Sequence, residues 1–267
     1  MNDLQDQVCL VVGGSHGIGR ASATLLHQRR ARVIVADISS PVPPLEPSLK
    51  HLHLDVTDQR SVDQAIRQIH REEGRIDVLI YCAMRADWRS VQQQSDEAML
   101  ATLRIGIEGM FVCTRAVLPI MLKQDCGRLV YVSSILSTIR VLRGCAAYAA
   151  VKAATDAWAE SLKMDLRDTS IEVSNIRPGL VAGTDFFRNG VSREVLPRLL
   201  DYLPSTTPSR VAETIVRSIS SSNRTYIVPP IYRILEIGYR LSPSLVRWLC
   251  RWGVSRRTDI QCKDELA

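Results

Sequence analysis

The sequence lacks the features that would mark a secreted, metal-binding or membrane-spanning protein. Its seven cysteines are an odd number, lie scattered along the chain and form no CxxC pair. This pattern predicts reduced thiols in the cytoplasm rather than a disulfide framework or a zinc site, so we expect no bound metal. We also expect no apolar stretch to be long enough to span a bilayer, and the polar opening of the chain is unlike a signal peptide.

Proline is scarce too, with 12 in 267 residues, and repeats and low-complexity segments are missing. With 46% hydrophobic residues, the chain is expected to fold around one substantial core in a single domain. The net charge of +6 arises between Arg224 and Arg257, where seven arginines face one acid, Glu236. Because the rest of the chain is neutral, we expect no nucleic-acid partner.

Apolar, β-branched runs alternate with segments of helical periodicity. The predicted strands are 8–13, 32–37, 51–55, 77–82, 128–133, 171–176 and, more weakly, 225–228. The predicted helices are 18–30, 59–72, 96–123, 147–167 and 209–220. Continuous apolar runs indicate strands buried on both faces, as in parallel sheets. The sequence therefore predicts an α/β fold with a doubly wound, Rossmann-type parallel sheet of about seven strands and helices on both faces.

A glycine-rich turn, VVGGSHGIGR, follows the first predicted strand and opens the first predicted helix. Gly13, Gly17 and Gly19 would let backbone N–H groups approach a pyrophosphate at the helix N-terminus. Asp37 ends the second predicted strand, 18 residues after Gly19, where a carboxylate can accept hydrogen bonds from a ribose diol. The simpler alternative is a tight turn and a solvated aspartate. In this strand–turn–helix context, we favour a dinucleotide site.

Tyr148 and Lys152 are four residues apart in the stretch YAAVK, so they share one face of a predicted helix. A phenol has a pKa of about 10, too high for proton transfer near neutrality, and a nearby ammonium is expected to lower it. Ser134, fourteen residues upstream, ends a buried strand where its hydroxyl could orient a carbonyl. Taken alone, the Tyr–Lys pair would be an ordinary helix face. The glycine turn and the serine make it a candidate catalytic pair.

Together these motifs resemble those of the short-chain dehydrogenase/reductase family over about residues 5 to 228. Two further stretches, LDVTD and RPGLVAGT, add to the resemblance. It implies that Tyr148 is the general acid/base, that Lys152 tunes it, and that Ser134 polarises a carbonyl. The nicotinamide dinucleotide that it implies would contact Gly13, Ser15, His16, Gly17, Ile18, Gly19, Asp37, Asp55, Val56, Ala83, Tyr148, Lys152, Pro178, Gly179, Val181 and Thr184.

The sequence departs from the family pattern at three places. The threonine usual before the first glycine is Val12, and the NNAG signature reads YCAM at 81–84. Gly106 stands where the family has an asparagine that holds a water near the lysine. We expect water to fill the place of that side chain, so that Gly106→Asn is tolerated. The alternative is a kink in the 96–123 helix that shifts the register by a residue.

The resemblance implies an oxidoreductase that moves a hydride between a nicotinamide cofactor and a hydrophobic secondary alcohol or ketone. Asp37 would repel the 2′-phosphate of NADP, so NAD is the expected cofactor. About half of the large apolar side chains in 185–208 are expected to wall the substrate pocket. Relatives in the family commonly form homodimers or homotetramers, and we expect the same here. The alternative function is a catalytically impaired member that binds dinucleotide and acts by association.

The segment 229–267 lies beyond the predicted dinucleotide-binding and catalytic domain, 1–228, as a basic, amphipathic C-terminal extension. Arginine, tryptophan and leucine mix in its 229–257 part, with Arg233, Arg240 and Arg247 seven residues apart. This composition suits a helix at a membrane interface, so peripheral membrane association is one expectation. A lid over the substrate pocket and an oligomer contact are the two alternatives.

Overall fold

The computed structural model describes residues 4–41, 44, 46–184, 196–221 and 224–256. Seven parallel strands form one sheet in the order β3-β2-β1-β4-β5-β6-β7. The strands are β1 (Val8–Val12), β2 (Arg32–Asp37), β3 (Lys50–His53), β4 (Val78–Tyr81), β5 (Gly127–Val132), β6 (Ile171–Pro178) and β7 (Thr225–Val228). Each matches a predicted strand to within two residues at either end. The prediction of a doubly wound parallel sheet in a single domain is confirmed.

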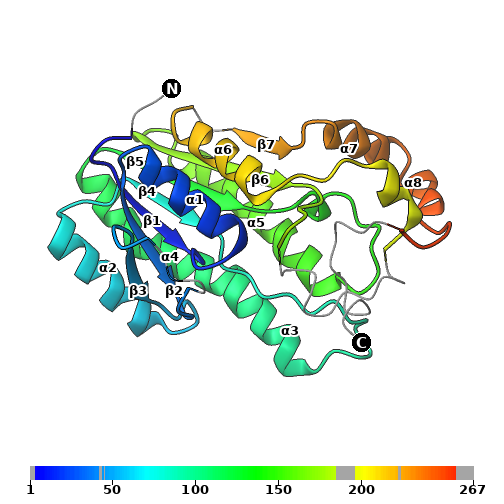
Figure 1. Ribbon diagram of the computed structural model, residues 1–267, viewed down its shortest axis with the longest axis horizontal. Helices are drawn as coiled ribbons and strands as arrows, with labels where there is room; N and C mark the ends of the chain where they lie inside the picture. The colour runs from blue at the N-terminus through cyan, green and yellow to red at the C-terminus, as the bar shows by residue number, and fades with distance from the viewer. Residues whose placement is uncertain (1–3, 42–43, 45, 185–195, 222–223, 257–267) are drawn as a thin grey trace.

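Helices cover both faces of this sheet (Figure 1). They are α1 (Gly17–Gln28), α2 (Gln59–Glu73), α3 (Asp96–Leu103), α4 (Gly109–Lys123), α5 (Ala146–Asp165), α6 (Pro208–Ile219), α7 (Tyr232–Leu241) and α8 (Pro243–Leu249). Successive residues of β1 point to opposite faces: Cys9 and Val11 join the cluster under α1 and α6, while Leu10 and Val12 join that under α2, α4 and α5. Burial on both faces explains the continuous apolar runs.

The way each helix begins separates α1 from several others. The side chains of Asp58, Ser95 and Thr207 accept hydrogen bonds from backbone N–H groups in the first turns of α2, α3 and α6. By contrast, α1 has no side-chain cap and no acidic residue in its first turn. Its N-terminal N–H groups, with the positive end of the helix dipole, are therefore left for another partner.

The long predicted helix 96–123 is interrupted by a π turn, η1 (Arg104–Glu108), between α3 and α4. By length and composition alone, the stretch Asp96–Lys123 is apolar enough to cross a membrane, so the prediction that no stretch has this length is wrong. Met110, Cys113 and Val117 of α4 are buried in the core cluster against the sheet. This packing accounts for part of the apolar character of the stretch, since 39% of its most apolar window is buried.

The C-terminal helices α7 and α8 follow β7 and lie together at one end of the molecule (Figure 1). Tyr232, Tyr239 and Val246 are buried in one cluster that also contains Tyr148. The described part of the extension, 229–256, therefore folds against the body and comes close to the predicted catalytic residues.

Candidate active site

A cavity of about 900 Å³ lies at the carboxyl edge of the sheet. Residues at or just after the ends of six strands line it: Val12, Asp37, Asp55, Cys82, Ser134 and Pro178. The strand order reverses between β1 and β4, and in open parallel sheets ligands bind in the crevice at such a switch point. Topology alone thus marks this cavity as the candidate site.

The structure brings the predicted site residues together in this cavity. It is lined by Gly13, His16, Gly17, Ile18, Gly19, Asp37, Asp55, Val56, Ala83, Ser134, Tyr148, Lys152, Pro178, Gly179, Val181 and Thr184. Ser15 is the exception, because it is buried beneath the turn. Its N–H donates to Asp37 Oδ2 at 3.0 Å, and its hydroxyl donates to the Ser39 carbonyl at 3.0 Å. Ser15 therefore fixes the turn in relation to β2.

Two glycines of the turn have distinct physical roles. A Cβ at Gly19 would lie 2.1 Å from the Gly13 carbonyl oxygen, so a side chain there would break the turn. Gly17 has a φ of +52°, and the nearest atom to a Cβ there would be Thr184 Cγ2 at 3.7 Å. Because Gly17 has no side chain, the backbone at the start of α1 is directly accessible from the cavity, next to the uncapped N–H groups. This is the arrangement that binds phosphate at helix N-termini.

Tyr148 and Ser134 meet in the middle of the cavity. Tyr148 lies in the first turn of α5, and Ser134 follows β5 and precedes the short 3₁₀ helix η2 (Ile135–Ser137). Ser134 Oγ accepts the Leu136 N–H at 3.2 Å, which holds the hydroxyl in place. Burial raises the pKa of Tyr148 to about 12, although its hydrogen bond with Ser134 acts in the opposite direction. The phenol is therefore held protonated near neutral pH.

Lys152 lies one turn further along α5, with its Nζ 5.6 Å from the centre of the Tyr148 ring. The ammonium donates to the Val132 carbonyl at 2.7 Å, and burial lowers the pKa of Lys152 to about 8. The expected lowering of the Tyr148 pKa is therefore not found in the structure described: burial of the phenol raises this pKa, and the contact that lowers it is the hydrogen bond with Ser134.

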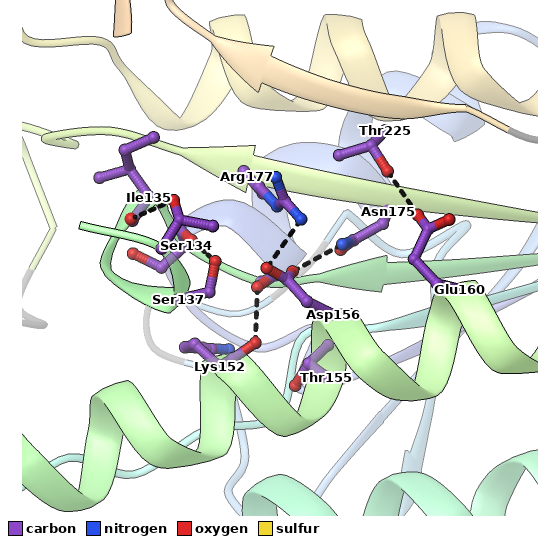
Figure 2. A network of polar contacts seen from close by, with 12 residues as sticks. Ser134, Ile135, Ser137, Lys152, Thr155, Asp156, Glu160, Asn175, Arg177 and Thr225 are labelled. Carbon is purple, nitrogen blue, oxygen red and sulfur yellow. Dashed lines mark hydrogen bonds and ion pairs between the residues drawn. The ribbon is translucent and has the colours of Figure 1, made fainter. Parts of the chain in front are cut away.

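A buried polar network holds α5 against β5 and β6 (Figure 2). The Ser133 hydroxyl donates to the Lys152 carbonyl at 3.0 Å. One turn along, the carboxylate of Asp156 accepts from Asn175 Nδ2 at 2.7 Å and pairs with Arg177 at 2.9 Å. These contacts fix the helix that carries Tyr148 and Lys152. They explain why polar side chains such as Asp156 and Asn175 are buried there.

Gly106 lies buried within the π turn and packs against α5. A Cβ at this position would lie 2.3 Å from Val151 Cγ1 and 3.1 Å from Met84 Sδ. The expectation that Gly106→Asn is accommodated by a water-sized space is therefore wrong, because neighbouring side chains already fill it. The π turn confirms that the helix is irregular at this point, as the alternative interpretation expected, while the shift of register by a residue stays a prediction.

Several lining residues escaped the sequence analysis. Trp88 is buried, and its ring centre lies 5.1 Å from that of Tyr148. Much of the remaining wall is apolar: Ile139, Val141, Leu142, Leu180, Leu199, Leu200, Leu203, Tyr232, Leu235, Val246 and Cys250. Of the apolar residues expected from 185–208, Leu196 is buried but does not line the cavity, Tyr202 is largely exposed, and Phe186 and Phe187 lie outside the described residues. Leu199, Leu200 and Leu203 line the cavity as expected.

Comparison with known proteins fixes the family. Residues 7–194 match the short chain dehydrogenase family. The chain belongs to this family. A Staphylococcus aureus (strain MRSA252) protein described as an uncharacterized oxidoreductase is 30% identical over 68% of this chain and 80% of its own. Oxidoreductase UcpA of Salmonella typhimurium is 32% identical over 68% of this chain and 72% of its own.

Among solved structures, the ligand-free aldohexose dehydrogenase of Thermoplasma acidophilum matches with a TM-score of 0.74. The match covers 85% of this chain and 93% of the other at 21% identity. This likeness supports the fold alone. As a short chain dehydrogenase, the protein is an oxidoreductase by family, and its substrate has to be argued from the cavity.

Proposed function

We propose that this short chain dehydrogenase transfers a hydride between NAD and a hydrophobic secondary alcohol or ketone. The observation that carries the proposal is one cavity that joins three parts: the bare start of α1, the Ser134–Tyr148–Lys152 group, and an apolar wall. The bare start of α1 would bind the dinucleotide, and the Ser134–Tyr148–Lys152 group would transfer the proton. The apolar wall would bind an apolar substrate. Their union in about 900 Å³ supports a two-substrate site.

The residues at the α1 end fit a dinucleotide. The uncapped N–H groups of α1 and the bare backbone at Gly17 suit a pyrophosphate. Asp37 Oδ2 accepts from Ser15 N–H, and Oδ1 accepts from the N–H and hydroxyl of Ser39 at 3.1 and 2.9 Å. Since a carboxylate can accept about four hydrogen bonds, Asp37 retains capacity for a ribose hydroxyl.

The preference for NAD rests on charge at the ribose position. The Asp37 carboxylate would repel the 2′-phosphate of NADP, and the next residue, Ile38, is exposed and carries no charge. Arg20 also lines the cavity, and its Nη2 donates to the Pro44 carbonyl at 3.0 Å. This arginine is the strongest argument for NADP, so both coenzymes belong in the assay.

When bound, the nicotinamide ring supplies or accepts the hydride. At the substrate oxygen, Tyr148 gives up its proton when a ketone is reduced and takes one when an alcohol is oxidised. The Ser134 hydroxyl donates a hydrogen bond to the same oxygen, and Lys152 provides positive charge behind the Tyr148 ring. The raised pKa of Tyr148 leaves its acid form dominant near neutral pH. Alcohol oxidation needs the phenolate, and its rate should therefore rise with pH.

The apolar wall indicates the substrate class. Leu142, Leu200 and Leu235 line the cavity from three separate segments. Apolar surface of this kind binds a hydrocarbon body, while Ser134 and Tyr148 are the polar groups that would fix one oxygen. A bulky secondary alcohol or its ketone satisfies both requirements.

A second candidate function is supported by Gly106, where the family's asparagine is replaced and the space is filled. This candidate is a catalytically impaired member that binds dinucleotide and acts by association.

One pair of measurements separates the two candidates. Purified protein is incubated with NAD or NADP and a graded series of secondary alcohols, and the reduced nicotinamide is followed by its absorbance. Calorimetry measures coenzyme binding on the same preparation. We expect turnover with NAD that increases with the apolar size of the alcohol. Coenzyme binding without turnover on any alcohol or ketone would favour the impaired member instead.

A further inference from the structure

The C-terminal helices expose an unusual concentration of large apolar side chains. Of the fifteen large apolar residues that are exposed in the described part of the chain, nine lie between 231 and 254. They are Ile231, Ile234, Ile237, Leu241, Leu245, Trp248, Leu249, Trp252 and Val254. We call this set the outer apolar face. Scattered exposed apolar residues need no explanation, but nine of them within one stretch of 24 residues point to an interaction surface.

The outer apolar face follows from helical periodicity in α7. Tyr232, Glu236 and Tyr239 point into the body at spacings of four and three, and all are buried. Ile234, Ile237 and Leu241 lie at the opposite phase, with exposed fractions of 66%, 52% and 82%. The exposed face of α7 is thus apolar, while the body covers the face that carries Tyr232, Glu236 and Tyr239.

The next helix, α8, repeats this division. Val246 is buried and lines the cavity, whereas Leu245 and Trp248 are about half exposed. Trp248 packs edge-on against Trp252, with ring centres 5.3 Å apart. Tryptophan at the margin of an apolar surface is typical of residues that lie at the level of lipid headgroups.

Positive charge accompanies the outer apolar face. Glu236, the one acid of 229–256, is turned inward, where its Oε1 pairs with Arg177 at 3.3 Å and with Arg240 at 2.7 Å. Arg233, Arg247 and Arg251 are exposed in the same segment, and no acidic side chain of 229–256 faces them. Long arginine side chains can lay their stems along apolar surface while their charged heads reach phosphates.

We propose that the outer apolar face of α7 and α8 docks on an anionic phospholipid surface. The apolar side chains would enter the headgroup–acyl boundary, and the arginines would contact lipid phosphates. Charge complementarity selects this occupant over a second copy of the chain, because two copies of the basic face would repel each other. The proposal is independent of the reaction, since it requires no bound coenzyme.

Sedimentation with lipid vesicles tests the proposal on the full-length protein. Vesicles of phosphatidylcholine mixed with phosphatidylglycerol are compared with phosphatidylcholine alone, at low and high salt. We expect at least tenfold stronger binding to the mixed vesicles at low salt, and loss of that difference at high salt. A blue shift of tryptophan fluorescence should accompany binding, because Trp248 and Trp252 leave water. Equal binding to both kinds of vesicle, or binding to neither, would overturn the proposal.

Matched variants localise the surface. Leu241→Glu places a charge at the most exposed point of the outer apolar face and should reduce vesicle binding at least tenfold. Met164→Glu is the control, because Met164 is 63% exposed near the end of α5, just before the amino end of β6, whereas α7 and α8 follow the carboxyl end of β7. The Arg233→Gln/Arg251→Gln double variant should lose the preference for anionic lipid. Circular dichroism establishes that each variant is folded.

Sedimentation velocity without lipid tests whether a second copy of the chain, rather than lipid, binds the outer apolar face. If Leu241→Glu converts a wild-type oligomer to monomer, and neither protein binds vesicles, the face belongs to a second copy and the lipid proposal is wrong. If Met164→Glu weakens vesicle binding as much as Leu241→Glu does, the outer apolar face is not the binding surface.

Discussion

At the α1 end of the cavity, the glycine turn and Asp37 line the wall beside polar residues such as Arg20 and Asp55, and a local stretch of sequence from Gly13 to Asp37 supplies many of these residues. At the α7–α8 end, apolar side chains such as Leu235 and Val246 line it, and they come from segments far apart in the chain. A backbone surface recognises the invariant part of a ligand, whereas side chains can be exchanged without changing the fold. This difference separates the end of the cavity suited to the proposed coenzyme from the end that would set substrate specificity.

Tyr148 lies where the two ends meet, so its removal should have the largest effect. Tyr148→Phe keeps the ring that packs on Trp88 but removes the exchangeable proton. We expect turnover to fall about 10²–10⁴-fold. Calorimetry should find NAD binding nearly unchanged, which separates a chemical defect from a folding defect. A variant that kept turnover within about tenfold of wild type would remove Tyr148 from its proposed role.

Asp37 tests the α1 end. In Asp37→Ala, the charge that opposes a 2′-phosphate and an acceptor for the ribose are lost together. Because hydrogen bonds to charged groups contribute about 1.5–3 kcal/mol, we expect the ratio of kcat/KM for NAD over NADP to fall roughly ten- to a hundredfold. Asp37→Asn is the control, since it removes the charge but keeps one amide oxygen, which can accept from the N–H of either Ser15 or Ser39. Equal use of both coenzymes by the unmodified protein would contradict the assignment.

A substitution at Gly106 tests the packing of the π turn η1 against α5, the helix that carries Tyr148. A side chain there meets Val151 Cγ1, and Val151 is fully buried on α5. We expect Gly106→Asn to lower the free energy of unfolding by about 1–3 kcal/mol, as overpacking does, when measured by urea denaturation. The double variant Gly106→Asn/Val151→Ala frees the space and should recover part of that loss. An unchanged midpoint of urea denaturation for the single variant would contradict this expectation, because it would mean that α5 can shift at the contact between Gly106 and Val151 at little cost in free energy.

Local signals in the sequence were sufficient for the strands and the α1 end. Continuous apolar runs mark buried parallel strands, and Gly17, Gly19 and Asp37 act within one strand–turn–helix unit. Ser134, Tyr148 and Lys152 were found because their spacing is typical of one family. All sixteen of the predicted residues that line the cavity belong to these motifs or to stretches that resemble them.

Contacts between segments that are distant in the chain could not be predicted from the sequence. Trp88 packs on Tyr148 from 60 residues away, and no periodicity links the two positions. The space beside Gly106 depends on Val151 and Met84, which belong to two other segments. The raised pKa of Tyr148 likewise depends on how deeply α5 is buried, whereas the sequence shows only that a lysine is near. Burial is a property of the whole fold.

Val246 tests the apolar end and should give the smallest effect. It lines the cavity from α8 and is buried beneath the outer apolar face. Val246→Ala removes two carbons from the wall, at about 0.8 kcal/mol per buried CH₂, and a substrate covers one side of the residue. We therefore expect kcat/KM for a bulky secondary alcohol to fall a few-fold, with the KM for NAD unchanged.

A matched variant separates an effect on the substrate from a general loss of stability. Val211→Ala makes the same truncation in α6, where Val211 is fully buried between α6 and the sheet and does not line the cavity. Both variants should lose stability to thermal unfolding, because each leaves a void in a packed cluster. Val246→Ala alone should change the ranking of alcohols by size, since its void opens toward the substrate. If Val246→Ala instead weakens NAD binding and leaves alcohol kinetics intact, the α7–α8 wall belongs to the coenzyme, and the proposed division of the cavity is wrong.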